Sequence, residues 1–322
     1  MRFDSRGLVS TYLSQWMPTN DARVSVAGYF GGGFDGGASA ITDRIDKIAF
    51  PLDTKSTISA VLTAPTGSTP AGLANSGVAG YFAGGNNVGG AISGIDKIAF
   101  PAETKSTLVA TLTAVNNAMA GAANSGVAGY FAGGGGVATT NRIDKITFPA
   151  DTKSTLSDTL TNSVLGVNGF ANSSVAGYFS GGFTGSVRVS TIDKITFPAD
   201  TKSTLSDTLT TARNAHSGAA DSGVAGYFAG GGSAGGQVSG IDKITFSTDT
   251  KSTLGVTLTA GTSLLAGMAD TGVAGYFGGG STTVSINRID KITFPADTKS
   301  TLTPTLTSTN EGLGAMADCG VF

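Results

Sequence analysis

One unit of roughly 49 residues is repeated six times along this chain, and little of the sequence lies outside the repeats. Each unit contains Gly-Tyr-Phe followed by glycines, then Ile-Asp-Lys-Ile-x-Phe, then Asp/Glu-Thr-Lys-Ser-Thr. Gly-Tyr-Phe begins at Gly28, Gly80, Gly129, Gly177, Gly226 and Gly275. A repeat of this size is one supersecondary element that buries its apolar surface only against its neighbours. The repetition therefore constrains the fold more strongly than any other feature.

Each unit is predicted to form four short antiparallel strands. In the fifth unit they are expected at Ser217–Ala220, Val224–Ala229, Ile241–Phe246 and Thr250–Leu258, with glycine- and serine-rich turns between them. No window has an apolar stripe of helical period and comparable length. Six such units in one chain predict an all-β fold, a six-bladed β-propeller of four-stranded antiparallel blades.

The repeated sequence motifs can be assigned to expected positions in a blade. Alanine and glycine dominate the first strand because it lies where the blades converge. Six tyrosines are expected to pack between blades: Tyr29, Tyr81, Tyr130, Tyr178, Tyr227 and Tyr276. The Asp of Ile-Asp-Lys-Ile is expected to meet the corresponding Lys of the next blade, as a pair that sets register more than stability.

The two ends of the chain predict a closed ring. The propeller, residues 23–322, begins with a second strand, and the segment Leu313–Phe322 matches Leu265–Val273, which contains a first strand. The last strand is therefore expected to pair into the first blade, which removes free sheet edges. An open solenoid is the alternative, and it would require capping units.

Composition excludes several classes of protein. Glycine is 49 of 322 residues without a Gly-X-Y period, which excludes collagen, and the 40% hydrophobic content excludes a disordered chain. The net charge of −2 gives no electrostatic sign of nucleic-acid binding, and all twelve lysines lie in the repeated motifs Ile-Asp-Lys-Ile and Thr-Lys-Ser-Thr. The sequence contains no run of 18 apolar residues, so we expect no membrane insertion, and no signal peptide is evident. Cys319 is the only cysteine, so no intrachain disulfide is possible.

The blade resembles a kelch repeat. Tyr227–Gly231 resembles the strand that ends in the kelch Gly-Gly, Asp200–Lys202 resembles its Asp-x-x-Thr turn, and Thr211–Gly218 resembles its Arg-x-x-His segment. The likeness covers about 300 residues and all six units, but the kelch tryptophan after the turn is absent from every copy. The resemblance implies a propeller that binds partners through its loops.

A second resemblance concerns the amino-acid sequence of the repeats themselves. Their near-identity and the phrase Asp-Thr-Lys-Ser-Thr-Leu are similar to glycine-rich propeller proteins of tailed bacteriophages. This resemblance implies a tail- or capsid-associated virion protein.

Catalysis is not predicted. The copper oxidases among kelch-like propellers need two histidines and a crosslinked cysteine, whereas this chain has only His216 and the terminal Cys319. Sialidase-type propellers need an aromatic Asp-box motif, and the sole tryptophan lies outside the repeats. The glycine-rich stretches open no helix, so no phosphate loop is indicated. We therefore expect no catalytic residue, cofactor or metal, and we expect His216 to be a packing or solvated residue.

Two sets of loops differ in variability. The turns after the first and third strands hardly change, whereas the loops after the second and fourth strands differ in every unit. Antiparallel topology places both variable sets on one face, and amides, arginines and aromatics there suit recognition of carbohydrate or protein. Drift of exposed loops is the alternative. This predicted variable rim comprises Phe34, Asp35, Asn86, Asn87, Asn116, Asn117, Asn141, Arg142, Phe183, Arg188, Arg213, Asn214, Gln237, Asn287, Arg288 and Asn310.

The segment 1–22 is the only stretch without a repeat. Leu8, Tyr12, Leu13 and Trp16 fall near one face of a short predicted helix that ends at Pro18. We expect a docking arm that binds other proteins of a virion, although packing under its own propeller is equally compatible with the pattern.

These observations predict a non-enzymatic structural or recognition module. The more specific hypothesis is a bacteriophage virion protein that is anchored by its arm and presents the variable rim to a host-surface glycan or protein. The alternatives are a cytoplasmic kelch-type scaffold for a protein partner and a carbohydrate-active enzyme with unrecognised carboxylates.

Overall fold

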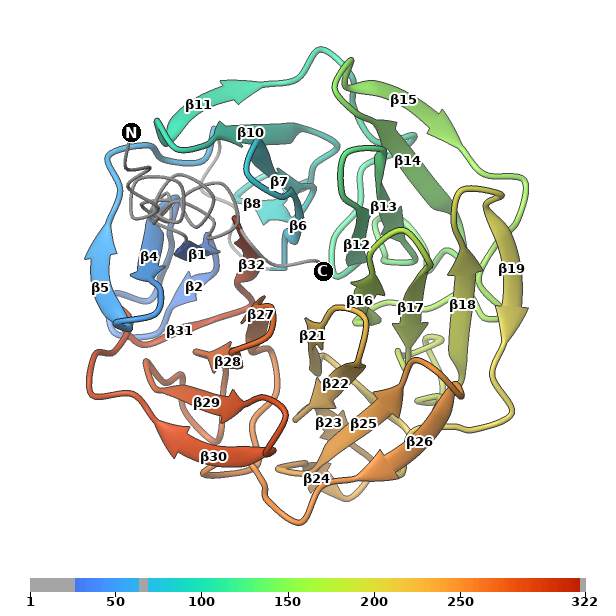
Figure 1. Ribbon diagram of the computed structural model, residues 1–322. Coiled ribbons are helices and arrows are strands. Elements are labelled where there is room, and N and C mark those ends of the chain that lie inside the picture. Colours follow the sequence, from blue (N-terminus) through green and yellow to red (C-terminus); the bar gives the residue numbers. More distant parts are fainter. Residues whose placement is uncertain (1–26, 64–68, 319–322) are drawn as a thin grey trace, which may run out of the picture.

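The computed structural model describes residues 27–63 and 69–318, and every regular element in these residues is a β-strand. Their main feature is six four-stranded antiparallel sheets, arranged around a common centre in a propeller-like way (Figure 1). The predicted arm, with Leu8, Tyr12, Leu13 and Trp16, lies outside the described residues.

Each sheet has an innermost strand near the centre and three further strands outward from it. In this order, the first three sheets are β32 (Gly314–Ala317), β1 (Ala27–Gly31), β4 (Ile45–Ala49), β5 (Thr54–Thr57); β6 (Ala71–Asn75), β7 (Ala79–Ala83), β10 (Ile95–Ala99), β11 (Thr104–Thr107); and β12 (Ala120–Asn124), β13 (Ala128–Ala132), β14 (Ile143–Thr147), β15 (Thr152–Thr155). The last three are β16 (Asn168–Asn172), β17 (Ala176–Ser180), β18 (Ile192–Thr196), β19 (Thr201–Thr204); β21 (Ser217–Asp221), β22 (Ala225–Ala229), β25 (Ile241–Thr245), β26 (Thr250–Thr253); and β27 (Ala266–Asp270), β28 (Ala274–Gly278), β29 (Ile289–Thr293), β30 (Thr298–Thr301).

The predicted strands of the repeat are confirmed with one correction. The fourth strand of the fifth unit ends at Thr253, not at Leu258. Leu254, Val256 and Leu258 continue the apolar alternation, but the chain has by then begun to cross toward the sixth sheet. Leu258 is buried in that crossing, which explains why the pattern continues after the strand has ended.

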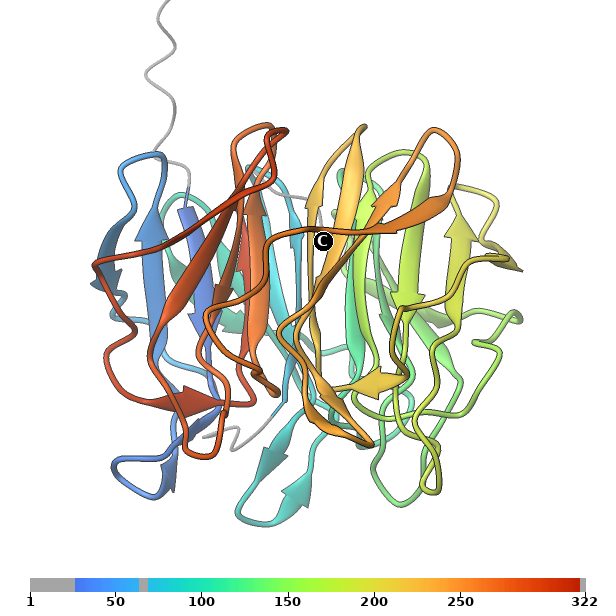
Figure 2. The same ribbon diagram turned by 90° about the horizontal axis from the view of Figure 1, so that it is seen from below.

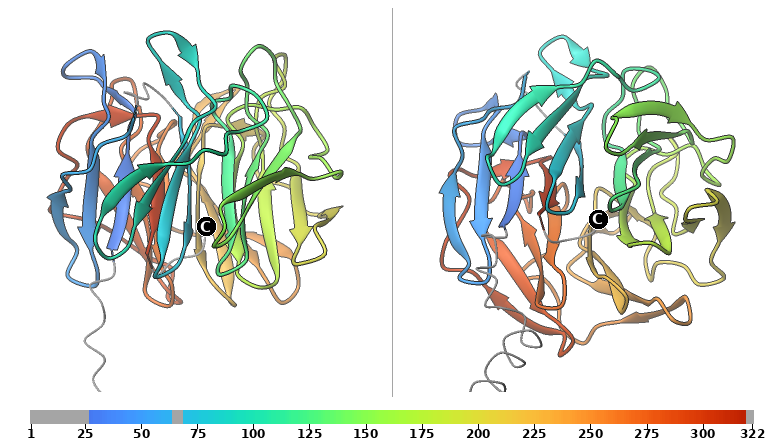
Figure 3. Two further views of the ribbon diagram at one scale, coloured as in Figure 1. Left: turned by 90° about the horizontal axis from the view of Figure 1, so that it is seen from above. Right: turned by 45° about the horizontal axis from the view of Figure 1, so that its top comes forward.

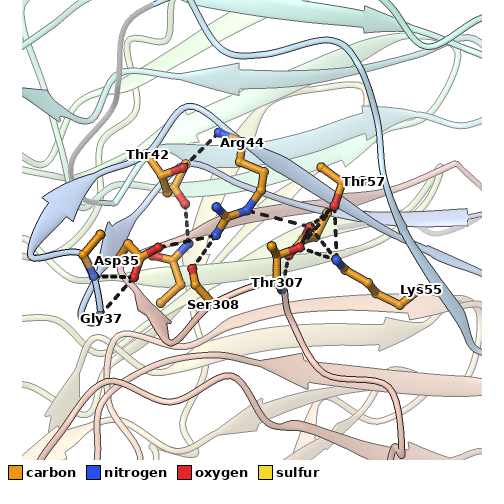
Figure 4. Close-up of polar contacts among 12 residues, drawn as sticks. Asp35, Gly37, Thr42, Arg44, Lys55, Thr57, Thr307 and Ser308 are labelled. Carbon is orange, nitrogen blue, oxygen red and sulfur yellow. Dashed lines mark hydrogen bonds and ion pairs between the residues drawn. The ribbon is translucent and has the colours of Figure 1, made fainter.

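The ends of the chain meet in one sheet. Strand β32 pairs with β1 in antiparallel register, with Tyr29 opposite Met316, as the sequence predicts. Figure 4 shows the junction beside this pairing, where Thr307 and Ser308 from the end of the chain lie against the first sheet. The Thr307 amide donates to Asp46 Oδ2 at 2.8 Å and the Thr307 hydroxyl to Oδ1 at 2.6 Å, while Arg44 donates to Ser308.

The centre of the molecule is narrow because the innermost strands approach one another through glycines. A Cβ added to Gly121 would lie 2.2 Å from the carbonyl oxygen of Gly72, and one added to Gly72 would lie 1.9 Å from that of Ala315. Gly218 and Gly267 have similarly close carbonyl neighbours in the preceding sheet. Glycine is therefore needed at this position because neighbouring backbones fill the space of a side chain.

A closed set of backbone hydrogen bonds surrounds the axis at one end of the innermost strands. Six residues, one before each innermost strand, each donate an N–H to the carbonyl of the preceding one, and the first donates to the last. These residues, called the axial ring below, are Thr69, Ala118, Gly166, Ala215, Leu264 and Gly312. All six have positive φ, between 50° and 65°.

Neighbouring sheets are joined by the same contacts at all six junctions. The tyrosine of each second strand is buried and stacks on a phenylalanine, as Tyr81 does on Phe148 at 5.1 Å between ring centroids. Its hydroxyl donates to a turn carboxylate of the next sheet, as Tyr81 does to Asp151 at 2.7 Å. Interblade packing of the six tyrosines is thus confirmed.

The predicted pairing of Asp with Lys between the Ile-Asp-Lys-Ile words is wrong. The Lys of this word donates to the turn carboxylate that the tyrosine also binds, as Lys97 does to Asp151 at 2.6 Å. The Asp instead accepts the amide and hydroxyl of a threonine in the crossing segment that follows the preceding sheet, as Asp144 does from Thr113. Alternation along a strand predicts which face a side chain occupies, but not which polar group it meets there.

Candidate functional site

The variable loops lie together on one face, as predicted. Short strands build most of it: β2 (Phe34–Asp35) with β3 (Ala40–Ile41), β8 (Asn86–Asn87) with β9 (Gly90–Ala91), β23 (Gly232–Ser233) with β24 (Gly236–Gln237), and the segments β20 (Arg213–Asn214) and β31 (Asn310–Glu311) that pair with β23 and β2. Figure 2 shows the blue and cyan hairpins projecting beyond the sheets on one side, and Figure 3 shows the same face from other directions.

The hairpins are held by the chain segment that enters the same sheet. Strand β31 pairs with β2, and β20 pairs with β23, while isolated bridges join Asn117 to Gly135 and Leu165 to Phe183. These hairpins therefore have a paired backbone along one side. The side chains of this face are therefore carried by a backbone that hydrogen bonds hold in place.

Three residues of the predicted rim are buried, and their assignment to an exposed recognition surface is a misassignment. Arg213, Asn310 and Asn116 are only 1%, 3% and 5% exposed. The Asn116 and Asn310 amides each donate at 2.8 Å to a backbone carbonyl, of Gly133 and Gly32. Arg213 donates to the carbonyl of Phe228 at 2.9 Å and pairs with Asp242 at 3.1 Å. These side chains fasten the variable loops to the sheets beneath.

Four further rim residues are tied to the framework at their own sheet. Arg142 and Arg288 each form an ion pair with the aspartate two residues later, Asp144 and Asp290, at 3.6 and 3.4 Å. Asn141 and Asn287 donate to the threonine hydroxyls of Thr159 and Thr305. Arg44 occupies the same repeat position as Arg142 and was missed; alignment of the six copies alone would have found it.

The remaining rim residues form separate contacts around the face. Phe34 and Asp35 lie in β2, Asn117 donates to Asn86 at 2.7 Å, Asn87 accepts the amide of Gly89 at 2.8 Å, and exposed Gln237 donates to the carbonyl of Ser281 at 2.8 Å.

Three predicted residues come together at the junction of the fourth and fifth sheets. The guanidinium of Arg188 lies over the ring of Phe183, with Cζ 5.7 Å from the ring centroid. Its Nε donates to Asn214 Oδ1 at 2.9 Å. Phe183 and Arg188 are opposite each other in one hairpin, and Asn214 lies in the segment that enters the next sheet. We call these three residues the Arg188 cluster.

A second polar group lies beneath this cluster. His216 is 1% exposed, and its Nε2 is 2.9 Å from the hydroxyl of Ser180. Burial, and next the charge of Arg213, hold the pKa of His216 well below its usual value, so the ring is neutral. His216 is therefore a packing residue, one of the two roles, packing or solvated, that the sequence left open. Five sibling copies have apolar residues or proline at its position.

A small cavity of about 100 Å³ opens at the axis beside these residues. Asn214 and His216 line it, together with members of the axial ring and apolar residues that include Leu265. A larger cavity of about 420 Å³ lies between the first two sheets. Its polar lining, Thr63 and Asp96, is already joined across the junction.

Within residues 27–63 and 69–318, no group of three or more histidine, cysteine or acidic side chains is placed to hold a metal ion. The same residues contain no helix with the length and apolarity to cross a membrane. No family model and no curated protein sequence matches this chain. The geometry of the variable face is therefore the main guide to function.

The buried imidazole gives a prediction for acidic pH. Because the pKa of His216 is lowered in the folded state, only the unfolded chain gains this proton as the pH falls below about 6.5, and stability is lost. We expect a loss of roughly 1 kcal/mol per pH unit between pH 6 and 5, measured from urea unfolding. The matched control, Ser180→Ala with His216→Leu, uses residues found in sibling copies and should be flat in this interval. An equal loss in the control would contradict the assignment to His216.

Proposed function

We propose that this chain is a closed, six-bladed, kelch-like β-propeller that acts as a non-enzymatic recognition module. One observation supports this proposal above the others. The six junctions use the same tyrosine, lysine, threonine and carboxylate contacts, whereas the differences between copies gather in the loops of one face. A framework of this kind holds diversified side chains at fixed positions, which is the requirement of a recognition surface.

The use of the acidic residues supports a non-enzymatic role. The aspartate of Ile-Asp-Lys-Ile accepts threonine hydroxyls and the turn carboxylate accepts tyrosine and lysine, at every junction. Burial raises the pKa of Asp46, Asp144 and Asp290, but hydrogen bonds from the threonines outweigh it and lower their pKa overall. These carboxylates remain ionised acceptors, whereas a general acid needs a raised pKa.

The more specific proposal is a bacteriophage virion protein. It depends on the likeness of the repeat wording to glycine-rich propellers of tailed phages, with the segment 1–22 as the anchor to other virion proteins and the variable face directed to the host surface. A virion protein needs no cofactor and no contact with nucleic acid, in agreement with the net charge of −2.

Two measurements test the proposal. Mass spectrometry of purified phage particles from the host that carries this gene should detect the chain at a fixed copy number, and its absence from the particles would refute a virion protein. A glycan array should then show binding to a defined set of glycans. Retention of a single cytosolic protein without glycan binding would favour a kelch-type scaffold, and turnover of a glycan would overturn the non-enzymatic role.

A further inference from the structure

The Arg188 cluster differs from the rest of the molecule in its charge balance. All twelve lysines and the arginines 44, 142, 213 and 288 have a carboxylate within 4.0 Å. Across residues 27–63 and 69–318, Arg188 is the only lysine or arginine for which no such partner is found. Since every other lysine and arginine among the described residues is paired with a carboxylate, Arg188 is the cation available for a ligand.

The guanidinium of Arg188 is also held in place. The Phe183 ring lies against its Cζ and Asn214 accepts its Nε proton, so two neighbouring side chains restrain the guanidinium. Backbone pairing of Phe183 with Leu165, at 2.8 and 3.0 Å, fixes the hairpin that bears the aromatic ring. An arginine fixed in this way loses little side-chain entropy when it binds a ligand, and its planar fork matches a carboxylate.

The layer beneath does not neutralise this charge. Arg213 is matched by Asp242 at 3.1 Å, and His216 is neutral, so the buried groups add no net charge. Ser180, Arg213 and His216 are each the sole residue of their type at their repeat position. These three departures from the repeat therefore meet at one of the six junctions, next to the axial cavity that Asn214 lines.

We infer that the Arg188 cluster binds the carboxylate of an acidic sugar, at one site per chain. Arg188 forms the ion pair, Phe183 and Asn214 are positioning residues, and the axial cavity accommodates a small substituent of the same sugar ring. This inference rests on the proposed recognition function and names its ligand class.

The surroundings favour a sugar over an acidic peptide. A peptide strand binds mainly through free backbone groups, but those of this hairpin are already used, since Phe183 pairs with Leu165 and the Thr184 amide donates to Val187. What remains at the surface is a set of hydroxyl and amide side chains, including Thr184, Ser186 and Asn214. Such groups suit the hydroxyls of a sugar.

The test uses isothermal titration of the full chain with three probes: 3′-sialyllactose, a disaccharide that ends in glucuronate, and lactose as the uncharged control. We expect one site per chain for at least one acidic probe and about tenfold weaker binding of lactose. Arg188→Gln should weaken the acidic probe by about tenfold or more, and Arg188→Lys should recover part of the loss because lysine keeps the charge without the fork. The matched control Lys153→Gln removes a cation of the outer strand β15, away from the variable rim, and should bind as the unaltered chain does.

Several outcomes would overturn the inference. They are binding of neither acidic sugar, equal affinity for lactose, six sites per chain, unchanged affinity in Arg188→Gln, or binding of a Glu-rich peptide in place of the sugars. An unchanged urea midpoint in Arg188→Gln shows that a loss of binding is not a loss of folding. If Arg188→Gln keeps the glycan-array pattern of the unaltered chain, this inference fails while the proposed recognition function stands.

Discussion

Gly121→Val is expected to abolish the native fold or to cost about 4 kcal/mol or more of unfolding free energy. A Cβ at this position would lie 2.2 Å from the carbonyl oxygen of Gly72, and backbone cannot move aside as a flexible side chain can. The same contact recurs around the axis, so relief at one junction would displace the next. Circular dichroism and urea unfolding measure the effect.

The chain offers a matched control for this substitution. Gly255 is exposed, a Cβ added to it would meet no atom within 4 Å, and its repeat position holds Val109 in the second unit. Gly255→Val should therefore change stability by less than about 0.5 kcal/mol. Equal stability of the two variants would show that the innermost strands are not in contact at the axis.

The second large effect is expected at alkaline pH. Burial, followed by the charge and hydrogen bond of the partner carboxylate, raises the pKa of Tyr29, Tyr81, Tyr130, Tyr178 and Tyr227 far above its usual value. In the unfolded chain these phenols lose their protons near pH 10, whereas in the folded chain they keep them. The folded state binds more protons, so stability is present below pH 10 and is lost as the pH rises above it.

The slope follows from the number of phenols. Each contributes about 1.4 kcal/mol per pH unit, so five together give roughly 7 kcal/mol per unit above pH 10. Phenolate absorbance at alkaline pH should therefore increase in the same sharp transition as the loss of circular dichroism. A smooth titration of all the tyrosines near pH 10, with the fold intact, would contradict their burial at the junctions.

Much of the framework could be predicted because its signal is repeated six times. Strand positions, tyrosine packing, the pairing of β32 with β1 and the shared face of the variable loops all follow from the pattern of apolar and small residues. The partners of Asp46 and Lys47 did not follow from it. Both lie at a junction with several polar groups, and the strand pattern does not show which of these groups each side chain meets.

Variation among the copies was a less reliable guide to the site. Arg213, Asn116 and Asn310 vary as surface residues do, yet each fills a buried position where more than one polar side chain can satisfy a backbone carbonyl. The axial ring had no sequence signal at all. Thr69, Ala118, Ala215 and Leu264 adopt positive φ because neighbouring sheets supply their hydrogen bonds, although none of these residue types favours that conformation.

The contacts between exposed residues of the variable face could not be predicted from the sequence either. Arg188, Phe183 and Asn214 were all predicted as rim residues, but their meeting at one junction depends on the pairing of a hairpin with the segment that enters the same region. The sequence alone does not show that Arg188 lacks a carboxylate partner among the described residues. This becomes clear only from the positions of the other lysines and arginines in the structure.

Amide hydrogen exchange at the axial ring tests the closed six-unit ring most directly. The Thr69 amide donates to Gly312 and so joins the start of the ring to its end, whereas the amides of Ala118, Gly166, Ala215, Leu264 and Gly312 each donate to the segment that precedes them in the chain. A closed ring predicts that all six exchange slowly and at similar rates, because opening any one requires the same disruption. Fast exchange at Thr69, with slow exchange at the other five, would contradict closure and the single variable face that depends on it.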